Sequence, residues 1–261
     1  MQIDRLTPEV RELASGLKLP EGPVALPDGS VILVEMRRQT LSRVTAAGQV
    51  EVVADLGGGP KGAIQVVDPR TGKVETLYDR CDGQPIGAPN VLVFDEAGGF
   101  WFTDFGVYRP GSTDGGGVYY ARADCSRIEA KIFPLDHPNG IGLAPDGKRL
   151  YVAETPTGRC IAYDLASPGV LAAATGDVLV ELEGQMFDSL AVDAHGHICS
   201  ATLATGAVSD VWPDGSRVDQ YLLPDPIVTN VCFGGPDRHT AFATLSLYGR
   251  LVAFDWPRAG A

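Results

Sequence analysis

The sequence has 261 residues, of which 44% are hydrophobic and 21% are charged. This composition suits one or two globular domains with a sizeable core. The formal net charge of -12 at pH 7 repels the phosphates of nucleic acids and the head groups of anionic lipids. We therefore expect neither nucleic acid nor membrane as a partner, whereas a bound cation is compatible with this charge.

The five cysteines are widely spaced and include no CxxC pair, so the sequence predicts neither a zinc ribbon nor a disulfide framework. The N-terminal segment lacks the apolar stretch of a secretion signal, and no run approaches the ~18 apolar residues that span a bilayer. These features favour a cytoplasmic protein with reduced thiols.

A segment that reads as strand, tight turn and strand recurs along the chain. Its five copies begin at Glu21, Asn90, Asn139, Asp188 and Asn230. In the first four copies this polar residue stands eight positions before a turn glycine, namely Gly29, Gly98, Gly147 and Gly196, and the fifth copy has Arg238 there. Since β-branched and aromatic residues occupy both arms, each copy predicts a β-hairpin.

A third strand follows in every copy, and a fourth follows in all but the last. Antiparallel four-stranded units of about 40–50 residues, repeated radially, are typical of a β-propeller. The last unit lacks its fourth strand, and the segment at about residues 9–19 resembles the missing piece. We therefore predict an all-β fold in which residues 1–261 form one β-propeller domain, closed by this N-terminal strand joining the C-terminal blade.

Two segments depart from the regular repeat. Between Leu56 and Asn90 the chain supplies only a third and a fourth strand, so about two inner strands are absent and the sequence predicts five full blades and a half. Lys61 in this segment belongs either to a solvated glycine-rich turn or to the central channel. The run "TDFGVYRPGSTDGGG" at residues 103–117 reads as a long loop.

The first strand of each propeller blade lines the central channel, so the five polar residues that open the repeats are expected to converge there. Taken singly, an Asn or Asp at a strand start usually satisfies nearby backbone groups. Two carboxylates and several carboxamides facing one another, however, would repel or stay unsatisfied unless water or a cation bridges them. Oxygen ligands without histidine or thiolate favour a hard divalent ion, Ca²⁺ before Mg²⁺ or Mn²⁺.

The runs "LPEGPVALPDG", "APNVLVFDEAGGFWFTD", "HPNGIGLAPDGKRLYVAET" and "DSLAVDAHGHI" resemble the regucalcin/gluconolactonase (senescence marker protein) family over nearly the whole chain. The resemblance implies a six-bladed propeller type, here with a second blade lacking about two inner strands, one divalent metal in the channel, and hydrolysis of small lactones. Carried over by motif, Glu21, Asn139 and Asp188 match metal ligands, and Asn90 matches a polar residue near metal and substrate.

We hypothesise a metal-dependent lactonase that opens small, sugar-type lactones. In it Glu21 and Asn139 hold the ion, Asp188 both binds the ion and acts as general base, and Asn90 orients the substrate. The ion is Ca²⁺ first, with Mg²⁺, Mn²⁺ or Zn²⁺ as alternatives. Two other functions stay open, an arylesterase or phosphotriesterase and a non-catalytic calcium-binding propeller; the sequence leaves the oligomeric state undecided.

Overall fold

The computed structural model describes residues 3–57, 62–109 and 112–261. The regular structure of these residues consists of β-strands, and they include no helix long and apolar enough to cross a membrane. The described residues fall into two compact units: unit 1 comprises residues 3–57, 67–74 and 188–261, and unit 2 comprises residues 62–66 and 75–187. That residues 1–261 act as one domain stays a prediction.

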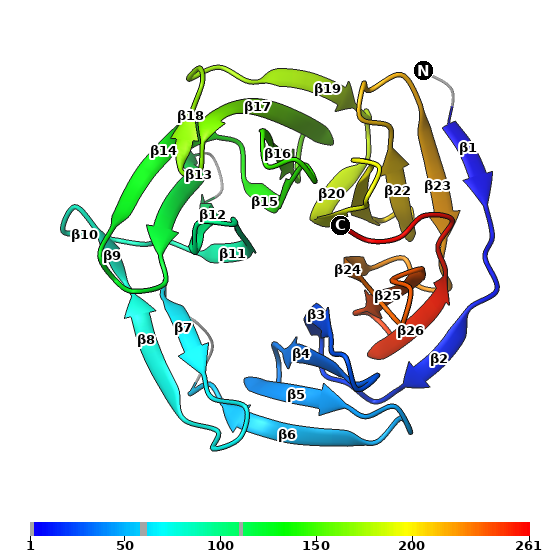
Figure 1. Ribbon diagram of the computed structural model, residues 1–261. Helices are drawn as coiled ribbons and strands as arrows, with labels where there is room; N and C mark the ends of the chain where they lie inside the picture. Colours follow the sequence, from blue (N-terminus) through cyan, green and yellow to red (C-terminus); the bar gives the residue numbers. More distant parts are fainter. Residues whose placement is uncertain (1–2, 58–61, 110–111) are drawn as a thin grey trace. The chain divides into compact units, whose positions relative to one another are not determined.

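Unit 1 contains three antiparallel sheets whose strands follow one another in chain order (Figure 1). The first sheet consists of β3 (Pro20–Ala25), β4 (Val31–Glu35), β5 (Thr40–Val44) and β6 (Val50–Asp55). The second contains β20 (Met186–Val192), β21 (Ile198–Leu203), β22 (Ala207–Val211) and β23 (Val218–Leu222). The third contains β24 (Val228–Gly234), β25 (Thr240–Leu245) and β26 (Arg250–Asp255). Strand β24 lies beside both β3 and β21, so the third sheet stands between the other two.

Two N-terminal strands complete the sheets of unit 1. Strand β1 (Ile3–Leu6) pairs in parallel with β23 and gives the second sheet a fifth strand. Strand β2 (Arg11–Ala14) pairs antiparallel with β26 and is the fourth strand of the third sheet. The beginning of the described chain therefore bonds to two neighbouring sheets near its end.

Unit 2 contains two larger sheets. One consists of β11 (Pro89–Phe94), β12 (Gly99–Arg109), β13 (Ser112–Arg122) and β14 (Ile128–Leu135). The other contains β15 (Pro138–Leu143), β16 (Arg149–Glu154), β17 (Arg159–Ser167), β18 (Val170–Leu171) and β19 (Asp177–Glu181). A small hairpin of β9 (Arg80–Cys81) and β10 (Gln84–Pro85) precedes them.

The number of blades corrects what the family resemblance implied. The described residues form five sheets of four or five strands, which are the blades of a propeller, and not six. Where the sequence predicted a second blade with only a third and a fourth strand, β7 (Ile64–Val67) and β8 (Val74–Tyr78) form a sheet of two strands. The reason lies in the chain length between Leu56 and Asn90, which is too short for four strands and their turns. Lys61 lies outside the described residues.

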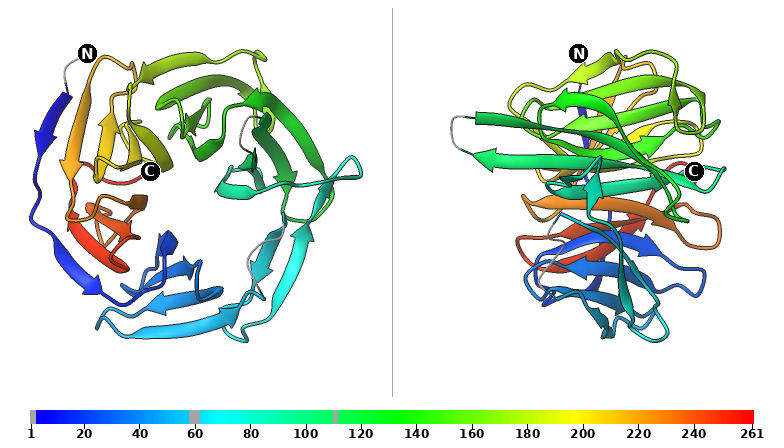
Figure 2. Two further views of the ribbon diagram at one scale, coloured as in Figure 1. Left: turned by 180° about the vertical axis from the view of Figure 1, so that it is seen from behind. Right: turned by 90° about the vertical axis from the view of Figure 1, so that its left-hand side faces the viewer.

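The expected long loop at residues 103–117 is also corrected. Strands β12 and β13 pair continuously as far as Arg109 and Ser112, and their hairpin extends beyond β11 and β14 (Figure 2). The glycines in this run pack closely: a Cβ on Gly116 would collide with the Asp104 backbone, and one on Gly117 would collide with the Phe133 ring. A glycine run that reads as flexible in the sequence is thus a strand that admits no side chain at these positions.

The hairpin turns bear out the repeat. The four turn glycines have positive φ, and Arg238, at the equivalent position of the fifth copy, adopts the same left-handed conformation with a φ of 60°. A non-glycine residue rarely adopts this conformation. The fifth copy therefore keeps the tight turn of the other four, although an arginine replaces the turn glycine.

Alternating apolar residues form the core between neighbouring sheets. In unit 1, Leu33 is fully buried and packs with Phe242 and Leu251, which joins the first sheet to the third. In unit 2, Trp101 and Leu150 belong to one cluster that joins the two larger sheets. Burial of these side chains between sheets supplies the main stabilising term for each unit.

Replacement of Leu33 by Ala tests this packing. We expect the Leu33→Ala variant to lose about 2–5 kcal/mol of unfolding free energy, because a buried cavity replaces the side chain. Leu247, which is 56% exposed in the same unit, provides the control, and Leu247→Ala should change that free energy by less than about 0.5 kcal/mol. Urea denaturation measures both values, and equal losses would contradict the packing described.

Candidate functional site

Each polar residue that opens a repeat lies on the first strand of its blade. In unit 1, Glu21 is on β3, Asp188 on β20 and Asn230 on β24. In unit 2, Asn90 is on β11 and Asn139 on β15. The residues are thus placed by strand register rather than by loops, which gives their side chains firm support.

Glu21 and Asp188 form the acidic part of the site in unit 1. Both residues are half-buried. Burial and the negative charge of Asp188 raise the pKa of Glu21 to about 8, although hydrogen bonds from Thr229, Asn230 and the Gly22 backbone lower it. Among the described residues, burial and the Asp188 charge are the two largest influences on this pKa. Two carboxylates therefore interact with each other where a positive charge would stabilise both.

Hydroxyl groups hold the strand that carries Glu21. Ser246 Oγ donates a hydrogen bond of 2.6 Å to the carbonyl oxygen of Pro20, and Thr229 Oγ1 lies 3.2 Å from the same oxygen. The two hydroxyl oxygens are themselves 2.8 Å apart. Because these contacts are buried, they fix β24 beside β3 at the residue preceding Glu21.

Asn139 supplies a buried oxygen in unit 2. Its side chain is 5% exposed, and no hydrogen bond from the described residues reaches its Oδ1 atom. The backbone oxygen of Asn139 accepts a 2.5 Å hydrogen bond from Thr103 Oγ1. The same hydroxyl oxygen accepts a 3.2 Å hydrogen bond from the N–H of Val91, the residue after the exposed Asn90. A buried carbonyl oxygen without a donor is costly, so a ligand for Oδ1 would be stabilising.

The donor atoms of these residues fit a divalent metal ion. Glu21 and Asp188 offer carboxylate oxygens, and Asn139 offers a buried carbonyl oxygen that lacks a partner among the described residues. Oxygen ligands of this kind suit hard cations such as Ca²⁺. The residues predicted as ligands therefore have the chemistry that the prediction requires, while the assignment itself stays a prediction.

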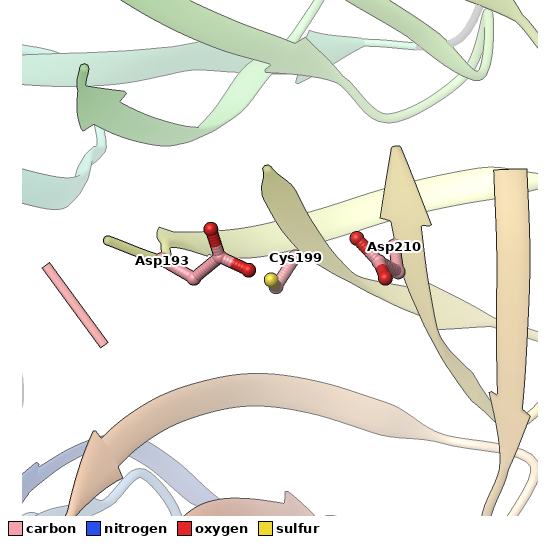
Figure 3. A group of neighbouring side chains, drawn as sticks. All are labelled: Asp193, Cys199 and Asp210. Atoms are coloured by element: carbon pink, nitrogen blue, oxygen red, sulfur yellow. The ribbon is translucent and has the colours of Figure 1, made fainter. Parts of the chain in front are cut away.

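A second acidic group lies on the sheet of β20 to β23. The ligand atoms of Asp193, Cys199 and Asp210 lie within 4.8 Å of one another (Figure 3). Arg258 forms ion pairs with both Asp193 and Asp210, and His197 Nδ1 lies 2.8 Å from Asp210 Oδ1. The guanidinium thus already supplies the positive charge that a metal ion would supply here.

The thiol of this group is buried beside two acids. Burial, followed by the charges of Asp210 and Asp193, raises the pKa of the Cys199 thiol well above its usual value. Because Arg258 pairs with both carboxylates, we interpret Asp193, Asp210 and Arg258 as a structural ion-pair network. The pair Glu21 and Asp188 stays the predicted metal site of unit 1.

Removal of Arg258 tests this conclusion. Arg258→Ala leaves two buried carboxylates without their partner, so we expect it to lower the unfolding free energy by about 3–5 kcal/mol. The exposed ion pair of Arg149 with Asp164 is the control, and Arg149→Ala should cost about 0–1 kcal/mol. Denaturant titration distinguishes the two; a small loss for Arg258→Ala would mean that the network is not needed for stability.

Two contacts of the site were not predicted. Asn230 was placed in register with the other polar residues, but its hydrogen bond to Glu21 was not anticipated, nor was that of Thr229. The repeat gives the position of Asn230, whereas the donor role depends on how β24 lies against β3. The polar pair Thr229 and Asn230 at the start of the fifth repeat is the signal in the sequence that could have indicated these contacts.

Comparison with known proteins gives a family match over most of the chain. Residues 19–246 match the family model described as SMP-30/Gluconolactonase/LRE-like region. Lactonase drp35 of Staphylococcus saprophyticus is 36% identical over 136 residues, 51% of this chain and 41% of that protein. Pentonolactonase XacC of Haloferax volcanii is 32% identical over 137 residues, 52% of this chain and 46% of that protein. The chain spans less than half the length of these curated relatives.

Solved structures resemble the chain over nearly its whole length. A gluconolactonase from Xanthomonas campestris is 23% identical, with a TM-score of 0.81 over 95% of this chain and 89% of that one. A calcium-binding protein, regucalcin, from Agrobacterium tumefaciens str. C58 is 20% identical, with a TM-score of 0.82 over 100% of this chain and 96% of that one. At such identities the likeness shows the fold, which is an all-β propeller.

Proposed function

The chain belongs to the SMP-30/gluconolactonase/LRE-like family, and we propose that it is a metal-dependent hydrolase that opens small, sugar-type lactones. The observation that carries this proposal is the pair Glu21 and Asp188, two acidic side chains of which the second, together with burial, raises the pKa of the first to about 8. The names of the relatives, a lactonase and a pentonolactonase, support the choice of lactones as substrates.

In this proposal Glu21, Asp188 and Asn139 hold one divalent ion. Ca²⁺ is the first choice, because the donor atoms are oxygens and because a structural neighbour is a calcium-binding protein. Mg²⁺, Mn²⁺ and Zn²⁺ are the alternatives. The unsatisfied Oδ1 of Asn139 supports its inclusion among the ligands.

The chemistry of the proposal requires a base and an orienting group. When bound, the ion supplies a Lewis acid for the lactone carbonyl. Asp188 takes a proton from water as the water oxygen bonds to the carbonyl carbon, and the proton passes to the ring oxygen when the ring C–O bond breaks. Asn90, exposed on β11, offers a carboxamide that can donate and accept hydrogen bonds to hydroxyl groups of a sugar-type substrate.

We further propose that the enzyme works in the cytoplasm on a small-molecule substrate and that residues 1–261 form one propeller domain. The net charge of -12 supports the exclusion of nucleic acid and anionic membrane as partners.

Thermal denaturation with and without metal tests the ion site. After chelator treatment, addition of Ca²⁺ at about 100 times its dissociation constant should stabilise the protein by about 2.7 kcal/mol, because the ion binds only the folded state. Glu21→Gln should lose this gain, whereas Cys199→Ser, which alters the second acidic group, should keep it. Mg²⁺, Mn²⁺ and Zn²⁺ are compared in the same assay. An equal gain in both variants would place the ion elsewhere.

Hydrolysis of glucono-1,5-lactone, followed by proton release, tests the activity. Asp188→Asn should lower kcat by about 10²–10⁴-fold, because the variant lacks the proton acceptor. Asp146→Asn, an exposed turn carboxylate that accepts a 3.0 Å hydrogen bond from the Lys148 N–H, is the control and should keep the activity. Turnover of aryl esters or phosphotriesters but of no lactone would favour the esterase alternative. Metal binding without any turnover would favour a calcium-binding propeller.

A further inference from the structure

Three blades open in the same way, with a proline directly before the predicted site residue. The pairs are Pro20 with Glu21, Pro89 with Asn90 and Pro138 with Asn139. A proline has no N–H to donate, but each of these prolines stands at a position of an end strand where the backbone nitrogen points away from the neighbouring strand, so the sheet loses no hydrogen bond.

A buried carboxylate lies opposite each proline in the sheet. The pairs are Pro20 with Glu35, Pro89 with Asp104 and Pro138 with Glu154. We call Glu35, Asp104 and Glu154 the strand-start carboxylates; all three are at most 5% exposed. Each follows its site residue by 14 or 15 positions in the sequence. The arrangement is therefore part of the repeat and not an accident of one blade.

Each strand-start carboxylate accepts a hydrogen bond from the N–H of the third residue before the site residue. Glu35 accepts from Lys18 at 2.8 Å. Asp104 accepts from Gly87 at 2.7 Å. Glu154 accepts from Asp136 at 2.8 Å. A charged acceptor makes such bonds stronger than neutral ones, and here they tie the chain just before the proline to the second strand of the blade.

A second hydrogen bond accompanies the first in each blade. The residue after the carboxylate donates its N–H to the carbonyl oxygen of the residue before the proline; the bonds are Met36 to Leu19 at 3.1 Å, Phe105 to Ala88 at 2.9 Å and Thr155 to His137 at 3.2 Å. Leu19 and His137 have positive φ values of 56° and 50°. Non-glycine residues adopt this conformation only where their surroundings hold them in it, and the two bonds do so.

The remaining two blades provide a natural comparison. Phe187 precedes Asp188 and Thr229 precedes Asn230, so neither strand has the proline. The position 14 residues after each polar residue is a threonine, Thr202 or Thr244, and not an acid. The buried acid thus occurs in the blades that have the proline, so the two features form one pattern of these blades.

We propose that Glu35, Asp104 and Glu154 are positioning residues of the site. Each fixes the backbone from which its own site residue, Glu21, Asn90 or Asn139 respectively, presents a side chain to the metal or the substrate. This inference rests on the proposed function for its ligands, but its geometry stands on the hydrogen bonds above. Outer partners of this kind keep ligating groups in place.

Asp104 allows the sharpest test. Its Oδ2 accepts from the Gly87 N–H, and its Oδ1 accepts from the N–H groups of Ala88 and Gly106 at 2.7 and 2.9 Å. Asp104→Asn would turn one oxygen into an NH₂ group that faces an N–H donor, so at least one bond must break. Asp95 is a matched control at the other end of β11, because it accepts bonds from the Ala97 and Gly99 N–H groups and the Tyr120 hydroxyl.

The first experiment uses NMR on the protein without added metal or substrate. In Asp104→Asn we expect amide exchange at Gly87 and Ala88 to be about tenfold faster or more, and the side-chain carboxamide signal of Asn90 to shift. In Asp95→Asn both should stay as in the unaltered protein. An unmoved Asn90 signal in Asp104→Asn, or an equal shift in both variants, overturns the proposal.

The second experiment measures Ca²⁺ binding by calorimetry. Glu154 Oε1 accepts from the Asp136 N–H, and Oε2 accepts from the Thr157 hydroxyl at 3.0 Å, which can reverse its role. Glu154→Gln can therefore keep both contacts, whereas Glu154→Leu loses them. We expect Ca²⁺ binding about 10–100-fold weaker in Glu154→Leu and near the original value in Glu154→Gln.

The outcomes separate this inference from the proposed function. Unchanged Ca²⁺ affinity in a folded Glu154→Leu overturns the role of Glu154. If Glu154→Leu does not fold, the NMR comparison of Asp104→Asn with Asp95→Asn decides whether a strand-start carboxylate positions its site residue. If the unaltered protein neither binds Ca²⁺ nor opens lactones, the proposed function fails, and the Asn90 signal still decides whether the carboxylate positions that side chain.

Discussion

A carboxylate buried across the sheet from the first strand shapes the blades that carry Glu21, Asn90 and Asn139. Burial of a carboxylate is unfavourable unless hydrogen bonds surround it, so the acid holds the backbone N–H groups that it accepts from. Those groups lie three residues before the site residue. The bonds that make burial of the acid tolerable therefore also hold the backbone from which the next side chain extends.

Unit 1 contains two kinds of acidic pair with opposite physical solutions. Asp193 and Asp210 share the guanidinium of Arg258, so their charges are neutralised within the chain. Glu21 and Asp188 act on each other, and the charge of Asp188, together with burial, raises the pKa of Glu21. Acidic residues gathered in space are thus no guide to metal binding until their neighbours are known. The difference lies in where the positive charge comes from.

The sequence was sufficient for the main features of the fold, because hairpins with turn glycines repeat at a readable period. The residues themselves predicted five full blades and two further strands, as the structure has them, whereas the six-bladed type that the family resemblance implied was wrong. The sequence prediction failed at residues 103–117, because glycine-rich runs look like loops whether or not a neighbouring ring or backbone requires them.

For the candidate site, the sequence predicted the strand positions of the residues but not their contacts. The repeat places Glu21 and its equivalents on the first strands, as the structure has them. The contacts of Thr229 and Asn230 with Glu21 depend on packing between sheets, which no spacing along the chain encodes. The proline and the acid 15 or 16 residues later did stand in the sequence, but their meaning needed the pairing of Pro20 with Glu35 to be seen.

The pairing of the N-terminal strands also bears on how the protein is made. Strand β1 bonds to β23 and β2 to β26, and the ion pair of Asp4 with Arg217 joins residues 213 positions apart. During synthesis β2 stays without its partner until β26, which ends at Asp255, has left the ribosomal exit tunnel. Closure of so long a loop is slow, and the edges of β1 and β2 stay unpaired meanwhile. The arrival of β23 and β26 therefore decides whether β1 and β2 join their sheets or pair with another chain.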